Sequence, residues 1–172
     1  MIFATVGTQL PFDRLLLGLD SWAAANPGVH VLAQSGATGR RFRHIETMAH
    51  MSQPMFRAAL QEARLIVSHA GMGTILSATD LGKPLVLMPR QAKFGEHRND
   101  HQQDTVHEMA RLSNVTVVED GEALHMALDA ALARGFETPL ARVEDGSEAL
   151  GPLVDAVRDF VWNRAPLGGA AA

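Results

Sequence analysis

The stretch between residues 65 and 89 constrains the fold more than any other part of the chain, because short apolar runs alternate there with glycines. Leu65-Ile66-Val67 is a β-branched apolar run of the kind that forms a buried strand. Gly82 is placed to end a short helix, and Pro84 prevents that helix from continuing. Leu85 to Met88 then predicts a second buried strand. The stretch therefore predicts a strand–helix–strand crossover in a parallel sheet.

The glycine turn inside this crossover is the first candidate binding feature. Gly71 and Gly73 permit a sharp turn and let a ligand approach the backbone closely. Thr74 is expected to open the helix, whose free N–H groups and positive dipole end would face the turn. Such a helix end favours anions, and a diphosphate suits it. Spacing alone leaves an alternative open, in which the glycines serve only the packing of an ordinary crossover.

Composition limits the class of protein. The chain has 172 residues, of which 47% are hydrophobic, and a formal net charge of −4. One domain with a complete core is expected, and nucleic acid is not an expected partner because basic residues are not in excess.

The absence of cysteine fits a reducing cytoplasm. No signal peptide is expected, and no apolar run approaches the roughly 20 residues that span a bilayer, so membrane association is expected to be peripheral or through a partner.

The remainder of the chain alternates predicted strands and helices. Such alternation predicts a parallel sheet covered by helices on both faces, the Rossmann-like α/β class. We expect a single domain over residues 1–163, a flexible tail over 164–172, and core positions for Trp22 and Phe56. The other predicted strands cover residues 2–6, 29–33, 42–45 and 115–118, with a mobile polar loop over 34–43, and the other predicted helices cover residues 12–23, 52–63, 99–112, 121–133 and 152–162.

Four polar loops are predicted at one edge of this sheet. They begin at Gly7, Gln34, Ser68 and Pro89, each directly at the end of a predicted strand. In parallel α/β sheets the ligand crevice lies beyond the carboxyl ends of the strands. The four loops should therefore converge there and form the site.

Several motifs taken together resemble a known family. They are Phe3-Ala4-Thr5-Val6-Gly7-Thr8 with Pro11-Phe12-Asp13, Ser68-His69-Ala70-Gly71-Met72-Gly73-Thr74, Gly82-Lys83-Pro84, Pro89, and Asp100-His101-Gln102-Gln103. The combination resembles the C-terminal nucleotide-sugar domain of family 28 glycosyltransferases. Within that family it is most similar to the small split members, the Alg13-like and PssE-like subunits. The resemblance covers residues 1 to 133.

The resemblance implies half of a GT-B glycosyltransferase, the half that binds the sugar donor. It implies a UDP-sugar as donor substrate, no metal or other cofactor, and a lipid-linked acceptor in exopolysaccharide or glycolipid synthesis. The acceptor half would come from a separate membrane-anchored chain of the Alg14-like or PssD-like kind. The chain would then be cytoplasmic, and peripheral at the cytoplasmic membrane face through that partner. Inversion at the sugar is implied as well.

The resemblance also assigns residues to the diphosphate and to the cleft. The turn residues Gly71, Met72, Gly73 and Thr74 would contact the diphosphate, and their amides would stabilise the departing UDP. Gly7 and Thr8 would border the cleft near the reacting centre.

Other positions correspond to the donor sugar and the ribose. Asp100, His101, Gln102 and Gln103 match the motif that contacts the sugar, and amide side chains suit sugar hydroxyls because they both donate and accept hydrogen bonds. For Asp100 the alternative is a charge that only stabilises a helix N-terminus. Ser77 stands where the family often has a ribose-binding glutamate, so UDP as the nucleotide is implied rather than fixed.

The catalytic base is the least determined part of the site. His69 is a local candidate, since a neutral imidazole can take a hydroxyl proton, and the alternative is a base on the partner chain. Asp13 lies too far into the first helix for this role. His97 and His101 are four apart, but the residue after His97 is Arg98, so they do not form a zinc-protease motif.

Alternatives from other functional classes remain. The missing ribose glutamate gives weight to a non-catalytic nucleotide-sugar-binding regulatory subunit. A dinucleotide oxidoreductase is disfavoured because the first predicted turn, residues 7–11, lacks Gly-x-Gly-x-x-Gly. Arg40, Arg41 and Arg43 form either a solvated loop or an anion-facing surface. The apolar stripe of the last predicted helix, with Leu153, Val157 and Phe160, packs either on its own sheet or on the partner.

Overall fold

The computed structural model describes residues 1–98, 102, 106 and 109–137. The chain divides into two compact units, Met1–Leu140 and Ala141–Ala172, and the described residues all belong to the first. The predicted helix over 152–162, the tail over 164–172 and three candidate site residues, Asp100, His101 and Gln103, lie outside the described residues. The expectation of a single domain over 1–163 stays a prediction.

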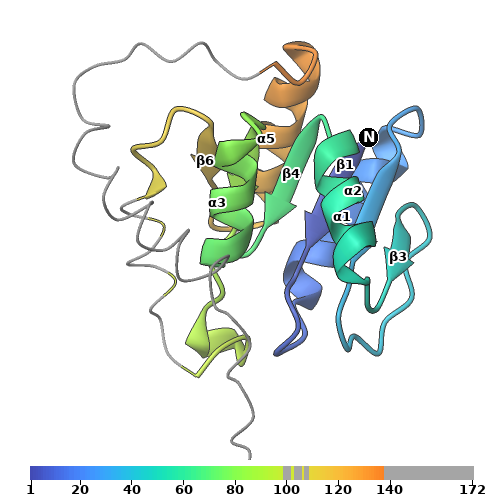
Figure 1. Ribbon diagram of the computed structural model, residues 1–172. Helices are drawn as coiled ribbons and strands as arrows, with labels where there is room; N and C mark the ends of the chain where they lie inside the picture. Colours follow the sequence, from blue (N-terminus) through green and yellow to red (C-terminus); the bar gives the residue numbers. More distant parts are fainter. Residues whose placement is uncertain (99–101, 103–105, 107–108, 138–172) are drawn as a thin grey trace, which may run out of the picture. The chain divides into compact units, whose positions relative to one another are not determined.

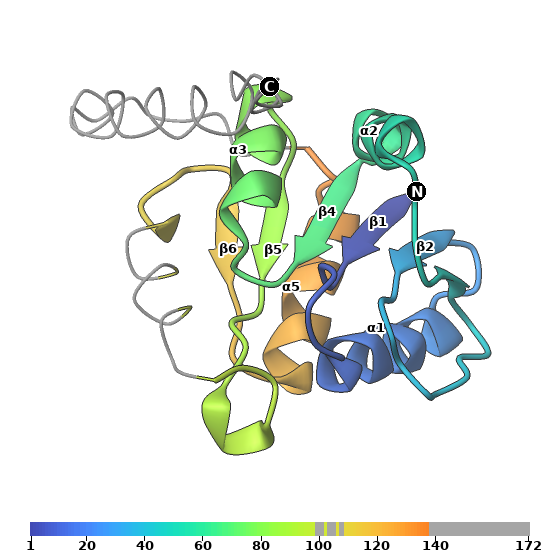
Figure 2. The same cartoon turned by 60° about the horizontal axis from the view of Figure 1, so that its bottom comes forward.

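The first unit is built on one six-stranded sheet in which all neighbouring strands are parallel. Figures 1 and 2 show the sheet in two views, with β1 and β4 at its centre. Across the sheet the strands are β3 (Glu46–Met48), β2 (Val31–Gln34), β1 (Ile2–Thr5), β4 (Leu65–Ser68), β5 (Leu85–Leu87) and β6 (Val115–Val117). This is the doubly wound order of the Rossmann-like class, so the predicted fold class is confirmed.

Strand β1 is the point at which the strand order reverses. Its first residue, Ile2, lies opposite Val31 of β2 on one side and Leu65 of β4 on the other. Strands β2 and β3 extend the sheet in one direction, and β4 to β6 extend it in the other. The crevice of such a sheet opens beyond the carboxyl ends of the two central strands, which here are Thr5 and Ser68.

Helices cover both faces of the sheet (Figure 2). Helices α1 (Asp13–Ala25) and α5 (Gly121–Ala133) pack together on one face. Helices α2 (Gln53–Glu62) and α3 (Met72–Asp80) cover the other face. Within the described residues, no helix is both long and apolar enough to cross a membrane.

The two core layers follow the apolar periodicity of the sequence. Trp22 is buried as predicted, and its indole N–H donates to the Asp129 carboxylate at 2.7 Å. Phe56 is only partly buried, with its ring edge-on to Phe3 at a centroid distance of 5.4 Å, so its predicted core position holds only in part. It is the neighbouring α2 residue Leu60 that is buried fully against the sheet.

The short edge strand lies later in the chain than predicted. The prediction of residues 42–45 is wrong, and β3 instead spans Glu46–Met48. The physical reason is the carboxylate of Asp20, whose Oδ1 accepts the backbone N–H groups of Arg43, His44 and Ile45 at 2.9, 2.7 and 3.2 Å. Those N–H groups are therefore not available to a strand ladder.

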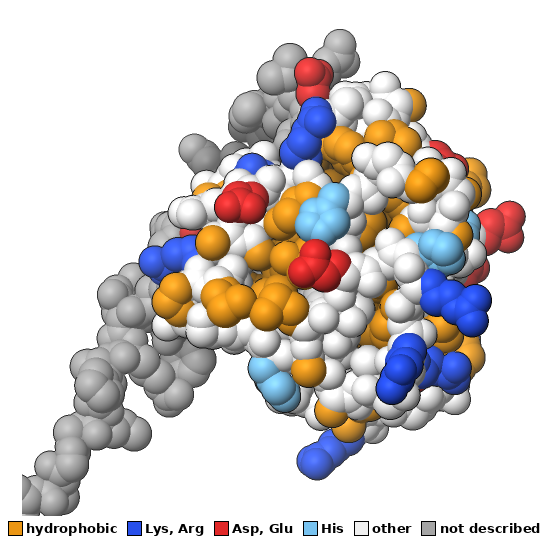
Figure 3. Space-filling view, turned by 90° about the vertical axis from the view of Figure 1, so that its right-hand side faces the viewer, with side chains coloured by type: hydrophobic (Ala, Val, Ile, Leu, Met, Phe, Trp, Pro, Cys, Tyr) orange, Lys and Arg blue, Asp and Glu red, His pale blue; other side chains and the backbone are white. Residues whose placement is uncertain are grey.

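The arginine-rich loop before β3 was expected to be mobile, but side chains of α1 hold it. Asp13 accepts from the Thr38 hydroxyl at 2.6 Å and from the Arg40 Nε at 2.9 Å. Arg41 and Arg43 keep exposed side chains. Figure 3 looks onto the side of the molecule where β3 forms the sheet edge, and basic side chains gather on part of that surface.

Helix α3 begins and ends at glycines. Its first residue is Met72, with Gly71 as the N-cap, so the prediction that Thr74 opens the helix is wrong by two residues. At the other end the Lys83 N–H donates to the Ala78 carbonyl and the Gly82 N–H to the Thr79 carbonyl, at 2.9 and 3.0 Å. This is a Schellman motif, and the predicted helix stop at Gly82 is confirmed.

Gly82 has a φ of +61°, and a Cβ at this position would meet no atom within 4 Å. Gly82→Ala should therefore lower the free energy of unfolding by about 1–2 kcal/mol through backbone strain alone. Gly28 is the control, because a Cβ there also meets no atom within 4 Å and no positive φ applies. Gly28→Ala should be neutral or slightly stabilising. Urea denaturation of both variants tests this, and equal effects would contradict it.

Candidate functional site

Loops from the carboxyl ends of four strands border two neighbouring cavities. The first, which we call the histidine cavity, has a volume of about 250 Å³, and the second, the α2 cavity, about 330 Å³. Thr8 lines both. The histidine cavity is lined mainly by Thr8, Gln9, His69, Arg90, His97 and Gln102, and the α2 cavity by Thr5, Gln34, His50, Met51, Phe56 and Thr74.

His69 is the first residue after β4, and its ring lies between two glycines. A Cβ on Gly7 would come within 2.8 Å of the ring's Cε1, and a Cβ on Gly71 within 2.5 Å of its Nε2. Gly7 also has a φ of +76°, whereas Gly71 has an ordinary φ of −92°. Gly71 is therefore required by the close approach of the imidazole rather than by its own backbone conformation.

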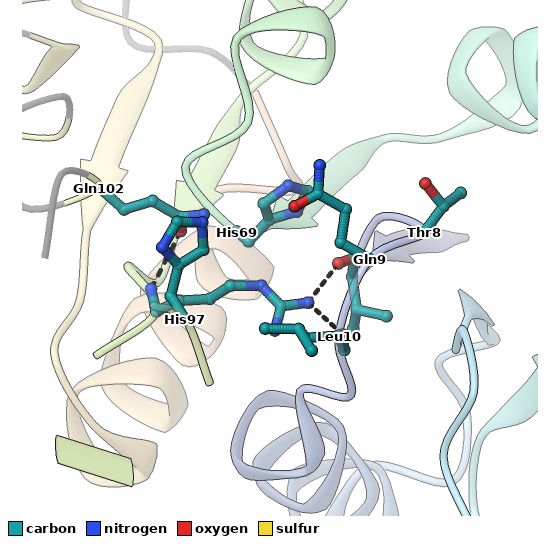
Figure 4. A pocket seen from close by; sticks show the side chains of 8 residues that line it. Thr8, Gln9, Leu10, His69, His97 and Gln102 are labelled. Carbon is teal, nitrogen blue, oxygen red and sulfur yellow. Dashed lines mark hydrogen bonds between the residues drawn. The ribbon is translucent and has the colours of Figure 1, made fainter. Parts of the chain in front are cut away.

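The environment of His69 keeps its imidazole neutral. The pKa of His69 is lowered from its ordinary 6.5 to about 4, chiefly by burial and next by the positive charge of Arg90, with a smaller contribution from the nearby His97. Figure 4 shows the His69 ring beside the side chain of Gln9, with His97 across the hollow. A neutral ring with an open cavity in front of it can accept a proton.

The amino end of α3 leaves backbone donors without acceptors. The N–H groups of Thr74 and Ile75 donate to the Gly71 carbonyl at 3.1 and 3.2 Å. For the N–H groups of Met72 and Gly73, no acceptor occurs among the described residues. A Cβ on Gly73 would meet no atom within 4 Å. The turn thus presents two free amides and an uncovered backbone, which is the arrangement that binds anionic oxygens.

Ser77 lies one helical turn after Gly73. Its hydroxyl donates to the Gly73 carbonyl at 2.8 Å, so the hydroxyl proton is already used. The oxygen keeps lone pairs with which to accept a bond from a ligand. Thr74 on the same turn is buried and lines the α2 cavity.

Gln102 is the one member of the predicted sugar motif that the structure describes. Its Oε1 accepts the backbone N–H of Arg90 at 3.0 Å, and its side chain lies beside the His97 ring at the edge of the histidine cavity (Figure 4). Further along the same segment, Val106 and Met109 are buried, whereas Ala110 is exposed.

The sequence analysis missed several polar side chains of the site, among them Gln9 and two buried residues. The buried Gln34 accepts from the Thr5 hydroxyl at 2.7 Å and donates to the carbonyls of Gly7 and Ala49. The other is Arg90, of which only 3% is exposed. No local pattern marks either residue, because their partners lie far away in the chain.

A metal site is not visible in the described part of the chain. No group of three His, Cys, Asp or Glu side chains comes together there. His97 lines the histidine cavity, and its possible partner His101 lies outside the described residues. Activity without a metal stays a prediction.

The fold is the Rossmann-like fold of the C-terminal half of a GT-B glycosyltransferase. The profile of the glycosyltransferase family 28 C-terminal domain matches residues 1–151. The chain belongs to this family, and the predicted resemblance is confirmed.

Individual relatives agree with this assignment. The chain is 25% identical over 140 residues to the UDP-N-acetylglucosamine transferase subunit ALG13 of Yarrowia lipolytica, a match that covers 72% of this chain and 67% of the relative. The solution structure of an ALG13 has a TM-score of 0.59 at 17% identity, covering 89% of this chain and 94% of that one.

A longer chain of known structure contains a similar fold. The crystal structure of Acinetobacter baumannii MurG has a TM-score of 0.57 at 20% identity, and the match covers 79% of this chain. The same match covers only 42% of MurG, so the chain spans less than half the length of that structure.

Because the pKa of His69 is lowered to about 4, the free energy of unfolding should depend on pH. Between pH 4 and 6.5 the unfolded chain binds a proton at this position and the folded chain does not. The free energy of unfolding should therefore rise with pH across this window, relative to a His69→Asn variant, and the difference should be constant above pH 7. Urea denaturation across this range and an NMR titration of the His69 ring test it; a midpoint near 6.5 would contradict it.

Proposed function

We propose that this chain is the donor-binding, catalytic subunit of a glycosyltransferase that moves a sugar from UDP to a lipid-linked acceptor. The observation that carries the proposal is the free amide pair of Met72 and Gly73 beside the neutral His69. N–H groups that can donate hydrogen bonds to an anion and an imidazole that can accept a proton lie at one edge of the sheet. The chain belongs to the family 28 glycosyltransferases. Transfer from a nucleoside diphosphate sugar needs both kinds of group.

The diphosphate would lie on the amides of Met72 and Gly73. The two cavities are lined by different kinds of side chain. This supports placing the nucleotide base in the α2 cavity and the sugar in the histidine cavity. The side chains of Met51 and Phe56 give the α2 cavity an apolar wall suited to a base ring. The amides of Gln9 and Gln102 suit sugar hydroxyls in the histidine cavity. Thr8, which lines both cavities, would lie near the bond that breaks.

In the proposed reaction an acceptor hydroxyl oxygen attacks the anomeric carbon of the donor sugar. The bond between that carbon and the UDP oxygen breaks, and UDP leaves as an anion stabilised by the α3 amides. The hydroxyl proton passes to a base, for which neutral His69 is the candidate on this chain. A base on the partner chain remains the alternative.

The acceptor half is proposed to come from a second, membrane-anchored chain of the Alg14-like or PssD-like kind. The supporting facts are that the chain matches only 42% of MurG but 94% of the ALG13 structure, and that the Yarrowia relative is described as a subunit. Under this proposal the chain is peripheral at the cytoplasmic membrane face and the acceptor is lipid-linked. Exopolysaccharide or glycolipid synthesis is the proposed setting.

A non-catalytic nucleotide-sugar-binding regulatory subunit is the second candidate. The observation that favours it is Ser77, whose hydroxyl proton is bonded to the Gly73 carbonyl and which cannot hold a ribose in the bidentate way of a carboxylate. This candidate predicts donor binding without sugar transfer when the partner is present.

Gly73→Leu tests the binding half of the proposal. The side chain would fill the space over the amides, so UDP affinity should fall at least a hundredfold while the fold is kept, because a Cβ there meets no atom within 4 Å. Gly28→Leu is the matched control, since Gly28 is equally open but lies before β2 at the opposite sheet edge.

Calorimetric titration with UDP, UDP-N-acetylglucosamine, UDP-glucose, ADP and NAD gives the measurement. Tight binding confined to UDP and one UDP-sugar is the expected result for the wild-type chain. Preference for NAD, or unchanged UDP binding by Gly73→Leu, would overturn the proposal.

The transfer step is tested by co-expression with the acceptor-half chain. The complex should transfer sugar from the bound UDP-sugar, and His69→Asn should lower kcat at least tenfold with little change in donor binding if His69 is the base. Full activity of His69→Asn would assign the base to the partner. Donor binding by a complex that shows no transfer would favour the regulatory subunit.

A further inference from the structure

One buried side chain with four hydrogen bonds, that of Arg90, is not used by the proposed chemistry. Arg90 follows β5 and is 3% exposed. Its two terminal nitrogens donate to four backbone carbonyls: Nη1 to Pro11 and Glu96 at 2.8 and 2.9 Å, and Nη2 to Val6 and Leu10 at 2.6 Å each. All four hydrogens of the two nitrogens are thereby used.

These carbonyls belong to two different loops. Three of them lie in residues 6–12, which we call the β1 loop, and one lies in residues 88–98, which we call the β5 loop. The guanidinium also lies over the Phe12 ring, 4.7 Å from its centroid. A planar fork is required to reach both loops at once, and a lysine cannot provide one.

Hydrogen bonds of neighbouring side chains also hold the β1 loop and the β5 loop. Arg14 of α1 makes a two-pronged ion pair with Glu96, with both N···O distances at 2.9 Å, and the backbone N–H of Gln91 donates to the same carboxylate. On the other side of the β1 loop, Gln34 donates to the Gly7 carbonyl at 3.2 Å. The β1 loop is thus held from both sides.

Arg90 also faces the groups proposed to act on the donor. Its backbone N–H donates to the Oε1 of Gln102 at 3.0 Å, and its side chain lines the histidine cavity together with Gln9 and His69. The terminal N–H groups of Arg90 all donate to backbone carbonyls, so Arg90 would act on the sugar donor through the loops that it holds and not by direct contact.

We infer that Arg90 is a positioning residue: its buried fork joins the β1 loop to the β5 loop and so sets the shape of the cavity that selects the sugar half of the donor. The inference rests on the proposed function. It differs from a purely structural role because it makes sugar recognition, and not nucleotide binding, depend on this side chain.

Two variants separate the fork from the charge. Arg90→Lys keeps a positive charge but not the fork, and Arg90→Met removes both. Arg64→Met is the matched control, because Arg64 likewise donates to a backbone carbonyl, that of Gly135, and lies 5.3 Å from the Phe136 ring centroid, but it precedes β4 at the amino edge of the sheet.

The first readout is calorimetric, with UDP and with whichever of UDP-N-acetylglucosamine, UDP-glucose, UDP-galactose and UDP-glucuronic acid binds the wild type most tightly. Arg90→Lys should bind UDP within about twofold of wild type but lose about tenfold in affinity for the UDP-sugar, the effect of one misplaced hydrogen bond. Arg64→Met should change neither affinity.

The second readout needs no ligand. Amide hydrogen exchange of the β1 loop should speed up in both Arg90 variants and not in Arg64→Met. The NMR titration midpoint of His69, which faces Arg90 and His97, should stay low in Arg90→Lys and rise in Arg90→Met, but remain below 6.5 because burial is the larger cause of the lowered pKa.

An unchanged ratio of UDP-sugar to UDP affinity in Arg90→Lys would overturn the inference. So would loss of the native amide spectrum in both Arg90 variants, because the residue would then serve stability alone. If the wild-type chain binds UDP and only this ratio is unchanged, the proposed function survives. If the wild type binds no UDP, the proposed function fails and the inference fails with it.

Discussion

The double pairing of β1, with β2 on one side and β4 on the other, is the constraint on which the rest of the structure depends. Because the strand order reverses at this strand, the loops after β1 and β4 open a crevice between them that no neighbouring crossover fills. The turn at Gly7 and the turn at Gly71 face each other there, and the His69 ring occupies the space between them.

Close packing at this point links structure to the proposed chemistry. The imidazole of His69 fits only because neither Gly7 nor Gly71 has a Cβ, and the resulting burial is the main cause of its lowered pKa. Gly73 serves differently, since nothing in the described fold occupies the space above it. One glycine of the Gly-x-Gly pair thus accommodates a protein ring, and the other leaves room for a ligand. Packing therefore accounts for Gly71, while the binding role of Gly73 stays a prediction.

The polar side chains beneath the crevice give its loops one defined shape. Gln34 and Arg90 together donate to carbonyls at four positions of the β1 loop, on its two sides. Buried donors and acceptors without partners are costly, so such a set favours a single arrangement over many loose ones. A cavity built from loops can distinguish ligands only if its walls are fixed in this way.

The sequence by itself determined the parallel sheet, the helix stop at Gly82 and helix α5, which spans Gly121–Ala133 as predicted. These features depend on apolar periodicity and on local backbone preferences, which are properties of neighbouring residues. It also predicted the candidate site at the carboxyl edge of the sheet, because topology alone fixes that edge.

Only the tertiary structure decided the shift of β3, the cradle of His69 and the bonds of Arg90. Asp20 takes N–H groups that the local pattern assigned to a strand, and Arg90 bonds Val6, a residue 84 positions away. The physical reason is that a buried polar group is satisfied by whichever partner the fold brings to it, and sequence spacing does not record which one that is.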